Sequence, residues 1–102
     1  MLKLSNSNVR RAVQNRAEFK NTNGTLFGKW ETPFLYVVYS YGEHFPLFLW
    51  DCNYTYGAWA CNTDKYSVTT SKHKTVANPQ CEMVSSDTQE MKAYIRKAQL
   101  EV

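Results

Sequence analysis

The sequence has few of the residues on which disulfide frameworks, metal motifs and membrane spans depend. Its three cysteines, Cys52, Cys61 and Cys81, lack C-x-x-C spacing, which argues against a disulfide framework and against a compact zinc or redox site. No run reaches the roughly 20 apolar residues of a transmembrane helix, and residues 1–8 lack the apolar centre of a signal peptide. We therefore expect a cytoplasmic protein that contacts no membrane and keeps reduced thiols in its core.

Recognised catalytic motifs are also missing. The sequence has no G-x-S-x-G elbow, no H-E-x-x-H motif, no paired acidic cluster for two metals and no glycine-rich phosphate loop. An enzyme hypothesis would have to use His44 and His73 as an acid and base pair, with Lys72 stabilising charge on phosphorus. We expect no enzyme, no cofactor and no metal site.

The composition is that of one folded, aromatic-rich domain spanning residues 1–102. Hydrophobic residues make up 43% of the chain and aromatic residues 15%, which is enough apolar material to offset the entropy of ordering a chain of this size. The net charge of +3 is only a weak hint of nucleic-acid binding.

The residue patterns predict an α+β fold, with an antiparallel sheet of about four strands and an N-terminal and a C-terminal helix packed on it. Turn residues, including the hairpin signal Asn23-Gly24, separate the strand-like runs. Both faces of the second run are apolar, so it is predicted to be the central strand. The runs are Thr25–Trp30, Phe34–Tyr41, Pro46–Asp51 and Tyr56–Asn62, with a short edge strand as an option at Glu82–Val84.

The two predicted helices differ in how well their charges fit a core. The last helix, capped by Ser85 or Ser86, carries an apolar stripe at helical spacing. The first helix, residues 8–20, places Arg16 and Lys20 near the middle of its apolar side, where charge is rare. Either both stems lie along the core edge with their charged heads in water, or this helix forms part of a binding face.

The segment from Thr63 to Lys74 is polar and has no clear period, and it is predicted to be an ordered loop with one helical turn at most. Its last six residues set three hydroxyls beside two ammonium groups and an imidazole, which together can surround a phosphate or a carboxylate. Alternatively, the hydroxyls satisfy the backbone of the loop itself.

The candidate binding residues are basic, hydroxyl-bearing and aromatic side chains. Basic groups can contact phosphates while tyrosines stack on bases. Exposed tyrosine and arginine also dominate protein interfaces, for which an aromatic sheet face or an unpaired edge strand would suffice. The candidates are Arg10, Arg11, Arg16, Tyr39, Tyr41, Tyr66, Thr70, Ser71, Lys72, His73 and Lys74.

Two stretches carry a resemblance to a known group of proteins: Y-V-V-Y-S-Y-G at 36–42 and N-T-D-K-Y-S-V-T-T-S-K-H at 62–73. With Asn78-Pro79 they resemble small accessory proteins of unknown function encoded by tailed bacteriophages and mobile elements. The resemblance covers most of the chain and implies a setting in a bacterial host cell, without activity or site residues. Small phage proteins made outside the virion often occlude a host enzyme or defence complex, CRISPR effectors included.

Two functions follow as expectations. The leading one is a phage-encoded protein that inhibits or modulates a host protein complex by stoichiometric occlusion, in antiviral defence, as anti-CRISPR proteins do. The alternative is a small nucleic-acid or nucleotide-binding module that uses the basic first helix and the T-T-S-K-H-K segment. The two differ in salt response, because phosphate contacts weaken steeply as salt rises.

Overall fold

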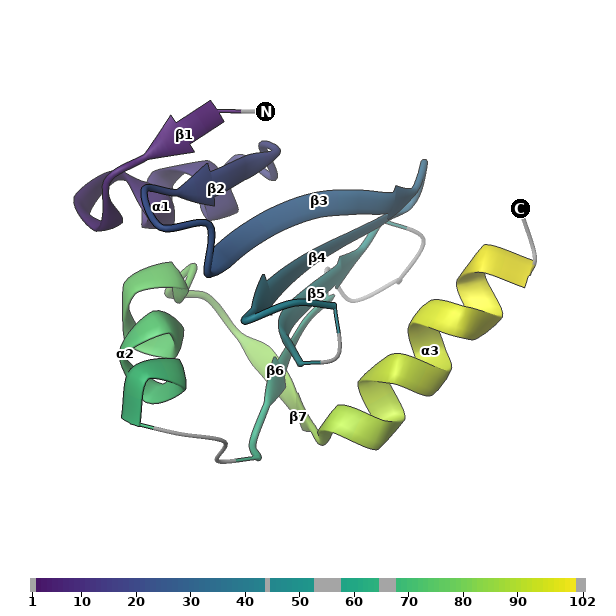
Figure 1. Ribbon diagram of the computed structural model, residues 1–102. Helices are drawn as coiled ribbons and strands as arrows, with labels where there is room; N and C mark the ends of the chain where they lie inside the picture. Colours follow the sequence, from purple (N-terminus) through teal and green to yellow (C-terminus); the bar gives the residue numbers. More distant parts are fainter. Residues whose placement is uncertain (1, 44, 53–57, 65–67, 101–102) are drawn as a thin grey trace.

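The computed structural model describes residues 2–43, 45–52, 58–64 and 68–100 (Figure 1). The strands form one sheet in which neighbours in the sheet are also neighbours in the chain. The elements are β1 (Leu2–Leu4), α1 (Asn6–Gln14), β2 (Phe19–Asn21), β3 (Leu26–Thr32), β4 (Leu35–Ser40), β5 (Pro46–Asp51), β6 (Ala58–Asn62), α2 (Val68–Ala77), β7 (Met83–Ser86) and α3 (Thr88–Leu100).

The sheet is mixed and has seven strands in the described part of the chain, so the prediction of an antiparallel sheet of about four strands is wrong. The predicted antiparallel runs are present as β3 to β6. The outer pairs β1–β2 and β6–β7 are parallel, because a helix within each connection returns the chain to the same end of the sheet. β1 and β2 have three residues each, which is too few for an alternating pattern to be recognised.

Strand β4 is the central strand, as predicted. All six of its residues are buried. Tyr36 and Val38 belong to the hydrophobic cluster on one face of the sheet, whereas Val37 and Tyr39 belong to the cluster on the other. A strand covered on both faces has to be apolar on both, and this is the pattern that its sequence shows.

Helices cover both faces of the sheet, with α1 and α2 on one side and α3 on the other (Figure 1). Val13 of α1 and Ala77 of α2 share one cluster, and Met91 and Ile95 of α3 belong to the second. The predicted N-terminal and C-terminal helices therefore do pack on the sheet, but on opposite faces.

Helix α1 ends at Gln14, so the predicted helix over residues 8–20 is too long. Arg16 has a left-handed backbone with φ of 52°, a conformation through which a helix cannot continue. The Arg16 guanidinium carbon lies 4.3 Å from the centroid of the Trp50 ring. Lys20 is exposed between two buried residues of β2. Its charge therefore does not lie on the apolar side of a helix, as the predicted helix would have required.

Helix α2 occupies most of the segment that was predicted to be a loop, so that prediction is wrong for residues 68–74. Thr70, His73 and Ala77 are buried at i, i+3 and i+7, the spacing of one helix face. Two of these three side chains are polar, which removes the apolar periodicity by which such a helix is usually recognised.

The cysteines were expected to be reduced thiols in the core, and no helix was expected to cross a membrane. All three cysteines lie in the described ranges as free thiols, and Cys52 and Cys81 are exposed while Cys61 is half-buried. The prediction of core cysteines is therefore wrong for the two exposed thiols. No helix in the part of the chain that the structure describes is long and apolar enough to cross a membrane.

Candidate functional site

Ser40, Thr70 and His73 form a buried polar cluster between β4 and α2. Ser40 Oγ lies 2.9 Å from Nδ1 of His73 and 3.3 Å from Oγ1 of Thr70. The ring of Tyr41 covers the imidazole, with the two ring centroids 5.4 Å apart. Burial lowers the pKa of His73 below its ordinary value, since a low-polarity environment disfavours the charged ring. The neutral imidazole therefore joins α2 to the centre of the sheet.

A serine bonded to a histidine is also the pair from which nucleophilic catalysis is built. Here, however, the exposed fraction of Ser40 is 0% and that of His73 is 5%. A nucleophile has to approach the reacting atom of a substrate to about 3 Å, which a fully buried hydroxyl cannot do without opening of the fold. The contacts of Ser40 with Thr70 and His73 are therefore better suited to holding α2 against the sheet than to catalysing a reaction.

Two of the predicted arginines contact the protein itself. Arg10 donates from Nε to the carbonyl of Asn78 and from Nη2 to that of Thr75, each over 2.8 Å. These carbonyls lie at and just beyond the C-terminal end of α2, where unpaired oxygens carry partial negative charge. Arg16 covers Trp50 and donates to the carbonyl of Gln14. Both cations thus stabilise the fold.

The other candidates are divided between surface and interior. Arg11, Ser71 and Lys72 are exposed, Lys74 is half-buried, and Thr70 is buried. Tyr66 lies outside the described residues. The predicted residues therefore do not converge on one open site.

Tyr41 and Tyr39 differ in accessibility. Tyr41 is 39% exposed, whereas Tyr39 is 2% exposed. The Tyr39 hydroxyl donates to Glu31 over 2.7 Å. The pKa of Tyr39 is raised, mainly because the side chain is buried and also because of this hydrogen bond. Its ring packs on Phe27 at a centroid distance of 5.2 Å. Tyr39 therefore offers no free face on which a base could stack.

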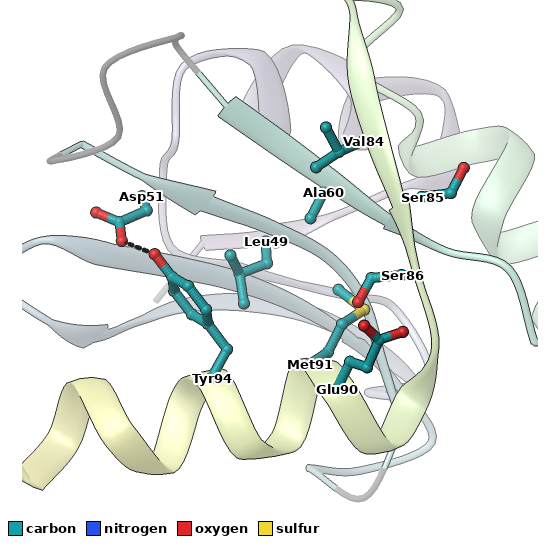
Figure 2. A pocket seen from close by; sticks show the side chains of 9 residues that line it. All are labelled: Leu49, Asp51, Ala60, Val84, Ser85, Ser86, Glu90, Met91 and Tyr94. Carbon is teal, nitrogen blue, oxygen red and sulfur yellow. Dashed lines mark hydrogen bonds between the residues drawn. The ribbon is translucent and has the colours of Figure 1, made fainter.

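A site that was not predicted lies between α3 and the strands β5 to β7. It is a pocket of about 220 Å³ whose apolar lining includes Leu49, Val84 and Met91. Figure 2 shows Asp51 and Glu90 toward opposite ends of the pocket, with Leu49 between them. Val84 is 53% exposed, so the apolar surface continues from the pocket onto β7.

The polar groups of the pocket are held by α3. The Tyr94 hydroxyl donates to Asp51 Oδ2 at the far end of β5. At the other end, Asp87 Oδ1 accepts from the Glu90 N–H over 2.8 Å, and Glu90 Oε1 accepts from the Asp87 N–H over 3.4 Å. This is a capping box, and it places the cap at Asp87 instead of the predicted Ser85 or Ser86.

Among the described strands, β7 is an edge of the sheet and pairs with β6. The carbonyl of Ser86 accepts from the N–H of Thr63 over 2.8 Å, so the backbone of Ser86 faces the β6 side. Backbone groups alternate in direction along a strand, so Met83 and Ser85 direct their N–H and C=O groups away from the sheet. The short edge strand considered at Glu82–Val84 overlaps the observed β7 at Met83 and Val84.

Among the residues that the structure describes, no group of three histidine, cysteine or carboxylate side chains is arranged to hold a metal ion. His44, one half of the acid and base pair that an enzyme hypothesis would need, lies outside the described residues. Comparison with protein-family models, with curated proteins and with solved structures found no match to this chain.

Proposed function

We propose that this chain is a small binding protein that inhibits or modulates a host protein complex by stoichiometric occlusion, without catalysing a reaction. The observation that carries the proposal is a contrast. Ser40 and His73, the groups suited to chemistry, are buried, whereas the edge strand β7 and the pocket beside it are open to a partner. Edge strands and apolar pockets at the surface are common docking sites for proteins.

The setting that we propose is the cytoplasm of a bacterium that carries a phage or mobile element, and the target is a complex of antiviral defence such as a CRISPR effector. This part of the proposal rests on the sequence patterns at residues 36–42 and 62–73, which we take to resemble those of phage accessory proteins. A domain without a catalytic group can still block a nucleic-acid channel or a subunit contact if it packs firmly against its target.

Affinity purification from an expressing bacterium, with nuclease added to the lysate, tests the proposal. We expect a host complex to be retained at a fixed molar ratio and to lose its activity when the purified chain is added in equimolar amount. Recovery of nucleic acid with no protein would support the nucleic-acid alternative instead. Turnover of a substrate by the purified chain would contradict the absence of catalysis.

A charge-reversal variant separates protein binding from phosphate binding. Arg11 and Lys72 are exposed basic residues of α1 and α2. The double variant Arg11→Glu, Lys72→Glu should retain the host complex if β7 is the interface. If phosphates are the target, this variant should lose binding, and binding by the unaltered chain should weaken steeply with salt.

A further inference from the structure

We propose that β7 accepts an extended peptide segment of the partner as an additional strand of the sheet. One apolar side chain of that segment enters the pocket beside Val84, and basic residues on both sides of it meet the surrounding carboxylates. The inference rests on the proposed function in taking the partner to be a protein, and it adds the chemistry of the segment that is recognised.

The first support is the hydrogen-bonding capacity of β7. The carbonyl of Ser86 points toward β6, where it accepts from Thr63. Since backbone groups alternate in direction along a strand, the N–H and C=O groups of Met83 and Ser85 point outward. An added strand would pair with these outward groups, and main-chain hydrogen bonds of this kind provide affinity in strand addition.

The second support is that the four residues of β7 include no charge and no proline. Proteins commonly prevent an exposed edge strand from pairing with another chain by placing lysine, proline or a bulge in it. The opposite edge strand, β1, carries the exposed Lys3. β7 has the sequence Met-Val-Ser-Ser and pairs with β6 in unbroken register from Met83 to Ser86.

The third support is the position of the pocket relative to the edge. Leu49, Ala60 and Val84 lie in one row across β5, β6 and β7, and all three line the pocket. The next position in that row is the place of an added strand, so a side chain there lies beside Val84. The 220 Å³ of the pocket equals the volume of about seven water molecules, which is room for one large apolar side chain.

The charge around β7 selects the flanking residues of the peptide. Glu82 precedes the strand and Asp87 follows it, while Asp51 and Glu90 line the pocket. The whole chain, in contrast, has a net charge of +3. Opposite charges placed next to each other across strands are favourable and like charges are unfavourable, so lysine or arginine should flank the apolar residue.

The same charges argue against a second copy of this chain as the occupant. Each end of β7 is adjacent to a carboxylate, Glu82 at one end and Asp87 at the other. Pairing of two β7 strands, in either direction, would bring these acidic ends together. Repulsion between them disfavours a dimer through β7.

A defined peptide titrated into the isotope-labelled full chain tests the inference by nuclear magnetic resonance. The probe is acetyl-Lys-Thr-Lys-Thr-Phe-Thr-Lys-Thr-Lys-amide, which as a strand puts the phenylalanine and the lysines on one face. We expect the largest amide shifts at Met83 and Ser85. A matched peptide with glutamate at every lysine position should bind about tenfold more weakly or not at all.

Two substitutions at one position separate the backbone from the side chain. Ser85→Pro removes an outward N–H while leaving the bonds to β6 in place, and Ser85→Ala keeps that N–H. We expect Ser85→Pro to weaken peptide binding about tenfold more than Ser85→Ala does, because only the proline removes the N–H that an added strand would bond. If Ser85→Pro does not fold, Val84→Lys serves instead, because it places a cation at the exposed side of the pocket and should also weaken binding of the basic peptide.

Several results would overturn the inference. These are equal binding by the Ser85→Pro and Ser85→Ala variants, shifts confined to α1 and α2, or concentration-dependent shifts at β7 without peptide, which would indicate self-association. Equal retention of a host complex by the wild type and by Ser85→Pro would contradict the inference about β7 but would agree with the proposed function. Peptide binding at β7 with no host protein retained from any lysate would agree with the inference but would contradict the proposed function.

Discussion

Arg10 and Arg11 are adjacent cations on α1 with different surroundings. Arg10 bonds two carbonyls at the end of α2, whereas Arg11 is exposed. Arg10→Ala should lower the free energy of unfolding by about 1–3 kcal/mol, because two carbonyls lose charged donors. Arg11→Ala, the matched control, should change it by no more than about 0.5 kcal/mol. Urea unfolding measures both, and equal losses would contradict a structural role for Arg10.

His73 makes the stability of the fold depend on pH. Its pKa is lowered by burial in the folded chain, while the unfolded chain has the ordinary value of about 6.5. The unfolded state therefore binds more protons between these two pKa values, so this contribution to stability is complete above about pH 6.5 and declines as the pH falls toward the folded pKa.

The pH dependence can be measured as the urea midpoint between pH 7.5 and pH 5. We expect the midpoint of the wild-type protein to fall, most of all below about pH 6.5. In His73→Gln the side-chain amide can still bond Ser40, but it has no titrating ring, so the midpoint should depend less on pH in this range. A steeper dependence in His73→Gln than in the wild type would show that His73 is not the group responsible.

At the scale of single elements, the start of α3 depends on two carboxylates. Asp87 accepts from the N–H of Glu90 over 2.8 Å, and Asp64 accepts from the N–H of Thr88 over 2.9 Å. The hydrogen bonds from Thr88 lower the pKa of Asp64, because they favour the ionised carboxylate.

Removal of the helix cap should have a measurable cost. Asp87→Ala leaves the Glu90 N–H without its acceptor and should lower the free energy of unfolding by about 1 kcal/mol. Gln89→Ala changes an exposed residue of the same turn and is the control, expected to stay within about 0.5 kcal/mol of the wild type. Thermal unfolding of the two variants compares them, and an unchanged Asp87→Ala would mean that the cap does not stabilise α3.

Some elements could be predicted from the sequence because a pattern of sufficient length marks them. β3 to β6 are rich in apolar and aromatic residues and are bounded by turn residues, and α3 carries the stripe from Met91 to Ala98. β1 and β2 are too short to show a pattern. α2 was missed because its buried face includes Thr70 and His73, whose burial depends on Ser40 in a distant strand.

The candidate site was harder to predict than the fold. The pocket draws Leu49 and Asp51 from β5, Val84 from β7 and Met91 from α3, and the sequence does not reveal that these segments meet. The sequence pattern instead favoured the basic and hydroxyl-rich stretches as binding sites. The structure shows that Arg10 and His73 in those stretches serve internal contacts.

At the scale of the whole molecule, the two edges of the sheet differ. β1 carries the exposed Lys3 and lies beside the exposed Lys20 of β2, whereas β7 lies between Glu82 and Asp87. The buried contact of His73 with Ser40 joins α2 to the sheet, and the pocket that Val84 lines adjoins β7. A partner segment with basic flanks is therefore expected at β7 and not at β1.

Hydrogen–deuterium exchange of the chain, free and in complex with its purified host target, tests this account most directly. The amides of Met83 and Ser85 should exchange rapidly in the free chain and slowly in the complex, because a strand of the target then accepts their hydrogen bonds, while amides of β1 should not change. Unaltered exchange at Met83 and Ser85, with protection appearing on α1 and α2 instead, would contradict it.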